Sequence, residues 1–151
     1  MLKYLLAAGP ETFNITAITR SDSTATFPSH PNLHVAKGSY DDTSFLESTL
    51  RGQDVLILTF HVLTKPETQF AFIRAAANAG VPWIVPNEWG CDGFNKPLAD
   101  SVVIIKKNEQ YRELIEELGK SKWIGMATGL WIDYVRSRFI APYFPGHQCV
   151  T

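Results

Sequence analysis

Apolar residues in the first part of the chain alternate between helical and extended spacing. Residues 2–8 are largely apolar and stop at Gly9 and Pro10, which predicts a short helix. Residues 13–19 alternate apolar and polar side chains, as a half-buried strand does, and residues 33–37 predict a second short strand. Proline interrupts the chain between these two strands twice, so we expect a loop there.

The middle of the chain continues with a helix and then a strand. Asp41 and Asp42 can cap the start of this helix, and Gly52 is a suitable residue to end it. Residues 54–60 are nearly all apolar and rich in strand-forming side chains. This pattern predicts a strand that is buried on both faces, as in a parallel sheet.

A further helix is well marked by the residues at its two ends. Thr64 and Glu67 have the spacing of a capping box, Pro66 suits an early helical position, and Gly80 can end the helix. Its predicted apolar stripe comprises Phe70, Ile73 and Ala77. A capped helix of this kind, placed between two apolar strands, is typical of a β-α-β unit.

The remaining patterned segments complete the alternation. Residues 81–86 predict a strand, and residues 87–100 predict a polar loop. An amphipathic helix begins near Lys107 and ends at Gly119, and residues 122–128 predict the last strand. The apolar face of this helix comprises Tyr111, Leu114, Ile115 and Leu118.

The order of these elements predicts one α/β domain over residues 1–151. Strands that alternate with helices through short turns imply a parallel sheet with helices on both faces, the doubly wound class. In this class, ligands bind outside the carboxyl ends of the strands, where the strand order reverses. We therefore expect functional residues directly after the predicted strands.

Composition narrows the class of protein. Apolar residues make up 45% of the chain and charged residues 19%, which is typical of a globular protein. The net charge of −1, without a basic run, argues against a nucleic-acid partner. No apolar run approaches the length of a membrane span, and the two cysteines, Cys91 and Cys149, are too few for a disulfide framework. We expect a cytoplasmic protein that binds neither nucleic acid nor membrane.

Three positions at strand or helix ends are candidates for chemistry. Arg20 ends the first strand, where a guanidinium can bind a ribose 2′-phosphate with help from the hydroxyl of Ser21; the alternative is a solvated arginine. Glu88 follows a buried strand and is either a site carboxylate or a packed loop residue. Lys107 either donates a proton or is solvated. His30 and His34 are four residues apart, but the prolines around them forbid the helix that a metal site of this spacing needs.

Four segments together resemble the NmrA-like family, which includes the isoflavone-reductase-like enzymes, atypical short-chain dehydrogenases. The segments are residues 13–28, 52–58, 75–90 and 111–125. The resemblance implies a Rossmann-like NAD(P)-binding domain that prefers NADPH to NADH. The cofactor-binding residues that it implies are Thr19, Arg20, Ser21, Thr59, Phe60, Pro86, Asn87 and Glu88. The family's catalytic lysine falls at Asn108 by register, so Lys107, one residue earlier, is the candidate.

The resemblance also implies that the chain is incomplete at both ends. The family starts with a central strand and a glycine-rich turn that binds the pyrophosphate, whereas this sequence starts within the following helix and contains no such turn. We expect impaired cofactor binding, because the turn that binds the pyrophosphate is absent from this sequence. We also expect marginal stability unless the two halves of the sheet pair directly. Three interpretations follow: an NADPH-dependent reductase of a small molecule, a non-catalytic NAD(P)-binding protein that passes a signal to a regulatory protein partner, or an incomplete product with neither activity.

Overall fold

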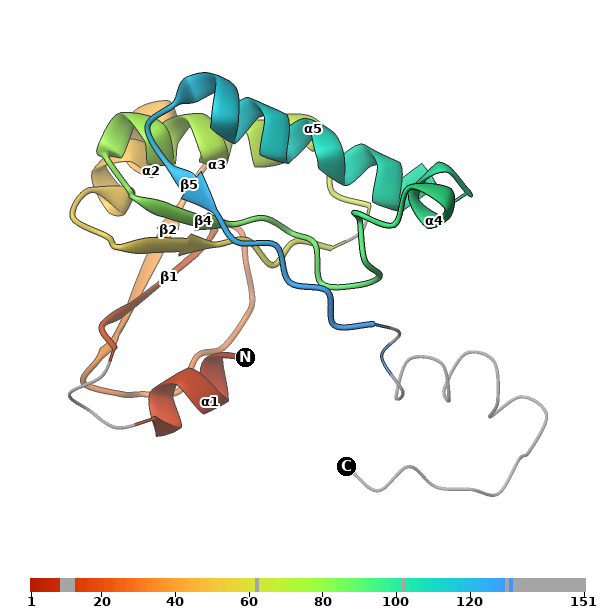
Figure 1. Cartoon of the computed structure of the whole chain (residues 1–151). Helices are drawn as coiled ribbons and strands as arrows, with labels where there is room; N and C mark the ends of the chain where they lie inside the picture. The colour runs from red at the N-terminus through yellow and green to blue at the C-terminus, as the bar shows by residue number, and fades with distance from the viewer. Residues whose placement is uncertain (9–12, 62, 102, 130, 132–151) are drawn as a thin grey trace, which may run out of the picture.

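A computed structural model describes residues 1–8, 13–61, 63–101, 103–129 and 131. Its elements in chain order are α1 (Leu2–Ala7), β1 (Ile15–Arg20), β2 (Leu33–Gly38), α2 (Thr43–Leu50), β3 (Val55–Ile57), α3 (Pro66–Ala79), β4 (Trp83–Val85), α4 (Lys96–Ser101), α5 (Val103–Leu118) and β5 (Lys122–Trp123). Figure 1 shows these elements on the ribbon.

The strands form two parallel groups. β1 pairs with β2 along its whole length, from Ile15 opposite Leu33 to Arg20 opposite Gly38. β3, β4 and β5 form a second sheet in that order, also with parallel pairing. The parallel α/β class predicted from the sequence is confirmed. In the described part of the chain, however, β1 and β3 do not pair with each other, so the two halves of the sheet stay separate.

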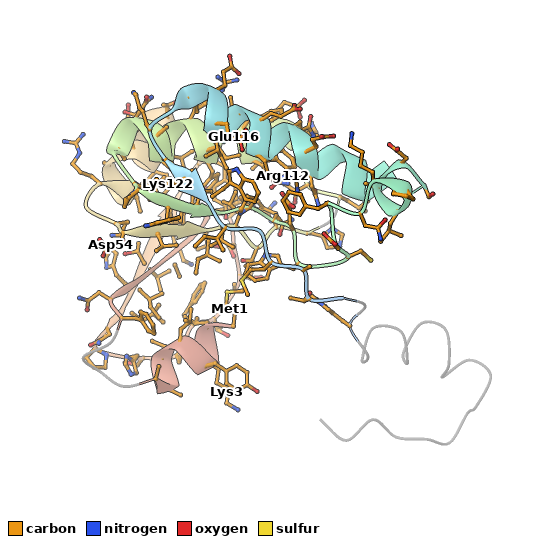
Figure 2. The ribbon with its side chains drawn as sticks, in the orientation of Figure 1. Met1, Lys3, Asp54, Arg112, Glu116 and Lys122 are labelled. Carbon is orange, nitrogen blue, oxygen red and sulfur yellow. The ribbon has the colours of Figure 1, made fainter. Side chains whose placement is uncertain are left out.

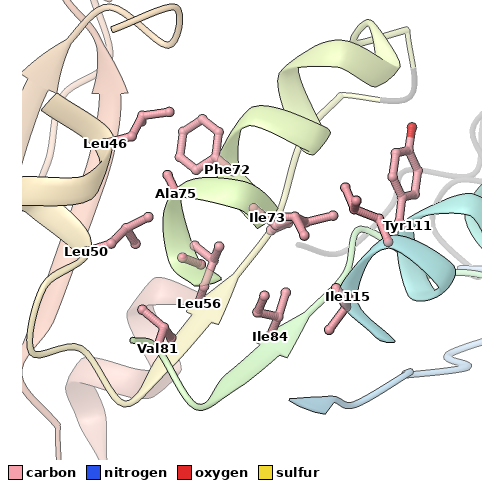
Figure 3. Close-up of a cluster of buried hydrophobic side chains, with 13 residues drawn as sticks. Leu46, Leu50, Leu56, Phe72, Ile73, Ala75, Val81, Ile84, Tyr111 and Ile115 are labelled. Carbon is pink, nitrogen blue, oxygen red and sulfur yellow. The ribbon is translucent and has the colours of Figure 1, made fainter. Parts of the chain in front are cut away.

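The hydrophobic core lies between the three-stranded sheet and one layer of helices. Side chains from α2, α3 and α5 pack against Leu56 of β3 and Ile84 of β4, as Figure 3 shows. Ile73 of α3 and Ile115 of α5 are 0% and 1% exposed. Burial of apolar surface stabilises a fold by about 25 cal/mol per Å². Among the described residues, this cluster is therefore the main source of hydrophobic stabilisation.

The prediction that the strand over residues 54–60 is buried on both faces is wrong. Leu56 is 6% exposed, but its neighbours Val55 and Ile57 are 43% and 37% exposed. Successive side chains of a strand point to opposite faces, and α2, α3 and α5 cover only the face with Leu56. α1 lies on the far side of β1, away from this layer (Figure 1).

The ends of α2 and α3 differ partly from the prediction. Asp42 caps α2 by accepting a hydrogen bond from the backbone N–H of Phe45 at 3.1 Å, as expected. The capping box predicted for Thr64 is wrong, because Lys65 is the residue before the helix and makes no side-chain cap. Pro66 is the first helical residue, and Gly80 ends α3 in the left-handed conformation, with φ of 80°.

Two predicted segments near the carboxyl end also change. The predicted polar loop over residues 87–100 contains the start of α4, which the side chain of Asn95 supports by accepting from Leu98 N–H at 3.2 Å. β5 is shorter than predicted and continues only as an isolated bridge between Gly90 and Ala127. Among the described residues, no helix is both long and apolar enough to cross a membrane.

Candidate functional site

The carboxyl ends of β1 and β3 face a shared cavity of about 730 Å³. Thr19 of β1 and Thr59 and Phe60, just past β3, line this cavity. Thr19 is buried, whereas Thr59 is exposed. The structure therefore brings together three residues that were predicted to contact a cofactor, although they come from separate sheets.

Arg20 and Ser21 continue β1 beyond this cavity and are not among its lining residues. The backbone of Ser21 is fixed, because its N–H donates to the carbonyl of Gly38 at 3.1 Å. The Arg20 side chain is 66% exposed and lies 3.4 Å from the carboxylate of Asp22. Surface ion pairs of this kind contribute about 0–1 kcal/mol, so the guanidinium can turn toward another anion at little cost.

The loop after β4 is fastened to the end of β3 by two side chains. The amide nitrogen of Asn87 donates to the carbonyl of Phe60 at 3.0 Å, and the indole N–H of Trp89 donates to the carbonyl of Leu58 at 2.7 Å. Pro86 at the start of this loop is fully buried. These contacts hold the predicted segment at residues 86–88 beside the carboxyl end of β3.

The carboxylate of Glu88 is turned toward α5. One of its oxygens, Oε2, lies 2.5 Å from Nη1 of Arg112, and both side chains are more than nine-tenths buried. The other oxygen, Oε1, is buried without a hydrogen-bond partner among the described residues. Burial raises the pKa of Glu88 above its usual range, and the Arg112 guanidinium opposes that shift.

Aromatic rings complete the surroundings of Arg112. Its guanidinium lies 4.8 Å from the ring centre of Phe94 and 5.6 Å from that of Trp123, and these two rings are stacked. Figure 2 labels Arg112 on α5 together with Glu116, one turn further along. A Cβ atom at Gly93 would lie only 3.1 Å from Arg112 Nη1, so a glycine there permits the close approach.

Sequence reasoning missed two residues near the site. Arg112 is three residues before Ile115 and therefore shares a face with the apolar stripe of its helix, which was the available signal. Tyr40 lines the cavity, donates its hydroxyl to the carbonyl of Ile18 at 3.3 Å and makes an edge contact with the ring of Phe60. Burial raises the pKa of the Tyr40 hydroxyl.

Lys107 is in α5, but its side chain lies outside the part of the chain that the structure describes.

Parallel strands that from β2 onward alternate with helices, with these side chains at their carboxyl ends, define a Rossmann-like α/β domain. The chain belongs to the NmrA-like family, whose model matches residues 2–148. The resemblance found in the sequence is thereby confirmed.

Known relatives agree with this assignment. The chain is 31% identical to the oxidoreductase aprR of Aspergillus flavus over 134 residues, which cover 85% of this chain and 43% of that protein. The fold is similar to isoflavone reductase, with a TM-score of 0.63, 18% identity and coverage of 81% of this chain and 43% of the other. It is also similar to AtPrR2 in complex with NADP+ and (+)pinoresinol, with a TM-score of 0.67, 17% identity and coverage of 89% and 46%. The chain thus spans less than half the length of each of these proteins.

Proposed function

We propose that this chain is an NADP(H)-binding unit of an NmrA-like protein. The observation that carries the proposal is the gathering of Thr19, Thr59 and Phe60 on one cavity, with Arg20 exposed beside it. Ligands of open parallel sheets bind at this edge. The bound forms of relatives such as AtPrR2, which is known in complex with NADP+, support the same class of ligand.

Arg20 is the proposed group for the 2′-phosphate of NADP(H). Its guanidinium can form two parallel hydrogen bonds to a phosphate, and the exposed hydroxyl of Ser21 can add a third. The site suits this role because the only charged partner described for Arg20 is the exposed Asp22. A phosphate carries more negative charge than one carboxylate and would compete for the guanidinium.

The nicotinamide half of the cofactor is proposed to lie along Thr59, Phe60 and the loop at residues 86–88. Asn87 ties that loop to the carbonyl of Phe60, so this wall is fixed before the cofactor arrives. Because this wall is already ordered, less conformational entropy is lost when the cofactor binds. The bound dinucleotide would supply a hydride. In this loop Pro86 and Asn87 are the proposed contacts with the dinucleotide; the carboxylate of Glu88, a further contact that the resemblance implies, is paired with Arg112 instead.

Affinity is expected to be low, because the sequence contains no glycine-rich turn to bind the pyrophosphate through backbone N–H groups. NMR titration of the chain with NADPH and NADH suits this range and reports the location of binding. We expect NADPH to shift the amide signals of Thr19, Arg20, Ser21 and Thr59 more strongly than NADH does. Shifts confined to other parts of the chain would contradict the proposed site.

The variant Arg20→Asp tests the residue itself. We expect the preference for NADPH over NADH to fall by about ten- to a hundredfold, because a charge-assisted hydrogen bond is worth about 1.5–3 kcal/mol. Arg51→Asp is the matched control: it makes the same change of charge, but Arg51 is exposed beside the amino end of β3. An unchanged preference in Arg20→Asp would show that Arg20 does not bind the 2′-phosphate.

A second candidate function is reduction of a small molecule with NADPH, which the 31% identity to an oxidoreductase supports. Lys107 is the proposed proton donor for this reaction. The competing proposal is a non-catalytic unit that binds the dinucleotide and contacts a regulatory protein. Adding pinoresinol to the NADPH titration tests for the reductase, because consumption of NADPH with this probe, and its loss in Lys107→Ala, would exclude a non-catalytic unit.

A further inference from the structure

The loop that follows β4 has little support from its own backbone. Glu88 N–H donates to the carbonyl of Pro86 at 2.7 Å, and Gly90 N–H donates to the carbonyl of Glu88 at 3.0 Å. Both hydrogen bonds join residues two apart, as in γ-turns, which are local structures of three residues. Local turns of this kind do not determine how the loop lies against its neighbours, so side-chain contacts to other elements set its orientation.

Three consecutive side chains hold this loop between two elements. Asn87 and Trp89 donate to carbonyls at the end of β3, whereas Glu88, between them, is turned toward α5. Among the described residues, Arg112 is the only hydrogen-bond partner of the Glu88 carboxylate, because the second oxygen has none. Arg112 is therefore the group of α5 to which Glu88 fastens the loop.

Arg112 is itself held in place by its neighbours. Its guanidinium lies against the rings of Phe94 and Trp123. The indole N–H of Trp123 in turn donates to Glu116 Oε1 at 2.9 Å, and Glu116 lies one turn after Arg112 on the same face of α5 (Figure 2). The position of the guanidinium is thus set by α5 and β5 together.

The buried position of the pair makes its removal from one side consequential. The side chains of Arg112 and Glu88 are only 9% and 7% exposed. Removing one partner of a buried pair leaves the other charge without compensation. Without Arg112, the Glu88 carboxylate would gain hydration by moving toward water. Asn87 is the adjacent residue, so this movement would also draw its amide away from the Phe60 carbonyl.

We propose that Arg112 is a positioning residue for the NADP(H) site: through Glu88 it sets the orientation of Pro86 and Asn87, which would contact the nicotinamide half of the cofactor. This inference rests on the proposed function of the chain. Arg112 is not among the residues that line the cavity between β1 and β3, so it acts on the ligand through the loop alone.

NMR titration with two ligands separates this role from a general effect on the fold. NADPH spans both halves of the site, whereas adenosine 2′-monophosphate carries only the half proposed for Arg20. In Arg112→Met, which keeps an apolar side chain beside the two rings, we expect about three- to tenfold weaker NADPH binding, because the unanchored loop must be ordered on binding. Binding of adenosine 2′-monophosphate should stay unchanged.

Three further variants define how Arg112 acts. Arg74→Met is the matched control: it makes the same change at an exposed arginine of α3 and should leave both affinities unchanged. The double variant Glu88→Gln/Arg112→Met should bind NADPH no more weakly than Arg112→Met alone, because both substitutions remove the same contact. Arg112→Lys should fall between wild type and Arg112→Met, because it keeps the charge but not the planar guanidinium against the rings.

The indole N–H of Trp89 reports the state of the loop without any ligand, because it donates to the carbonyl of Leu58. Its hydrogen exchange should be faster in Arg112→Met than in wild type, while the backbone amide of Ile84 in the core stays unchanged. If Arg112→Met does not fold, Arg112→Lys serves for the same comparisons, with a smaller effect in the same direction.

The outcomes distinguish this inference from the proposed function. Unchanged NADPH affinity in Arg112→Met, equal weakening of both ligands, or an additive loss in the double variant would overturn the positioning role and leave the proposed function standing. A wild-type chain that binds neither ligand would overturn the proposed function, and this inference with it.

Discussion

At the scale of single residues, Glu88 shows what position in the sequence can and cannot predict. Its place directly after a buried strand predicted that it would lie at the carboxyl edge of the sheet, and the structure has it there. The direction of its carboxylate was not predictable, because Arg112 is 24 residues away and meets it only through the packing of α5. Arg20, by contrast, has an exposed side chain at a strand end. Its position in the sequence was therefore sufficient to predict that its guanidinium is available to an anionic ligand.

The buried pair gives stability a specific pH dependence. Burial raises the pKa of Glu88 in the folded state above its ordinary value of 4.5. Between the unfolded and folded pKa values the folded state holds more protons, so this group's contribution to the free energy of unfolding falls as pH rises. In urea titrations from pH 4 to pH 7, we expect wild type to lose stability relative to Glu88→Gln as pH increases.

The variant Glu113→Gln is the control for this pH series. Glu113 is one residue from Arg112 on the same helix, but its carboxylate is exposed to water. The difference between wild type and this control should stay level across the series. A stability difference for Glu88→Gln that stays level or widens in favour of wild type as pH rises would contradict the raised pKa.

At the scale of secondary structure, the interior of each element was more predictable than its ends. The apolar stripe of α3 was sufficient to identify the helix, since Ile73 and Ala77 are buried as its spacing predicted. The capping box at Thr64 failed because Thr64 N–H bonds to the carbonyl of His61, in a turn that precedes the helix. Helix capping depends on the backbone conformation of the residues just before the helix. Tertiary contacts set this conformation, so the sequence pattern alone does not predict it.

The cap of α2 is a testable case, because the sequence offers two adjacent aspartates and the structure uses only one. Asp42→Ala removes the acceptor of the Phe45 N–H. We expect a loss of about 0.5–2 kcal/mol in the free energy of unfolding, measured by urea titration. Asp41→Ala makes the same chemical change at an exposed neighbour that does not cap the helix, and should cost less than 0.5 kcal/mol. Equal losses in the two variants would show that the cap does not stabilise the helix.

At the scale of the whole molecule, the separation of the two sheets follows from where the apolar surface is buried. The helix layer packs on β3 and β4, while β1 has one buried residue, Thr19, and β2 has none. The apolar spacing along the chain predicted each strand and the parallel class, because both depend on local pattern. It did not predict the exposed side chains of Val55 and Ile57, because exposure depends on which segments cover a strand.

The β1–β2 pair has little buried apolar surface, whereas β3 and β4 carry the core. This difference predicts that local stability differs between the two sheets. Segments with little buried apolar surface open at low free energy, whereas the core opens only in global unfolding. In hydrogen exchange followed by NMR, we expect the amides of Ala17 and Thr19 in β1 to exchange faster than those of Ile84 and Val85 in β4. Comparable rates in the two strands would show that the β1–β2 pair unfolds together with the core.

Tyr40 is the contact that should set the rate of opening of β1. Its hydroxyl bonds to the carbonyl of Ile18, and its ring packs on Phe72 with centres 5.0 Å apart. Tyr40→Phe keeps the ring and removes a bond worth about 1 kcal/mol, so β1 amides should exchange about fivefold faster while β4 amides stay unchanged. Tyr4→Phe makes the same change at a side chain that is 77% exposed, and should alter neither strand. Faster exchange throughout the molecule in Tyr40→Phe would instead mean that Tyr40 stabilises the core as a whole, and that both sheets form one cooperative unit.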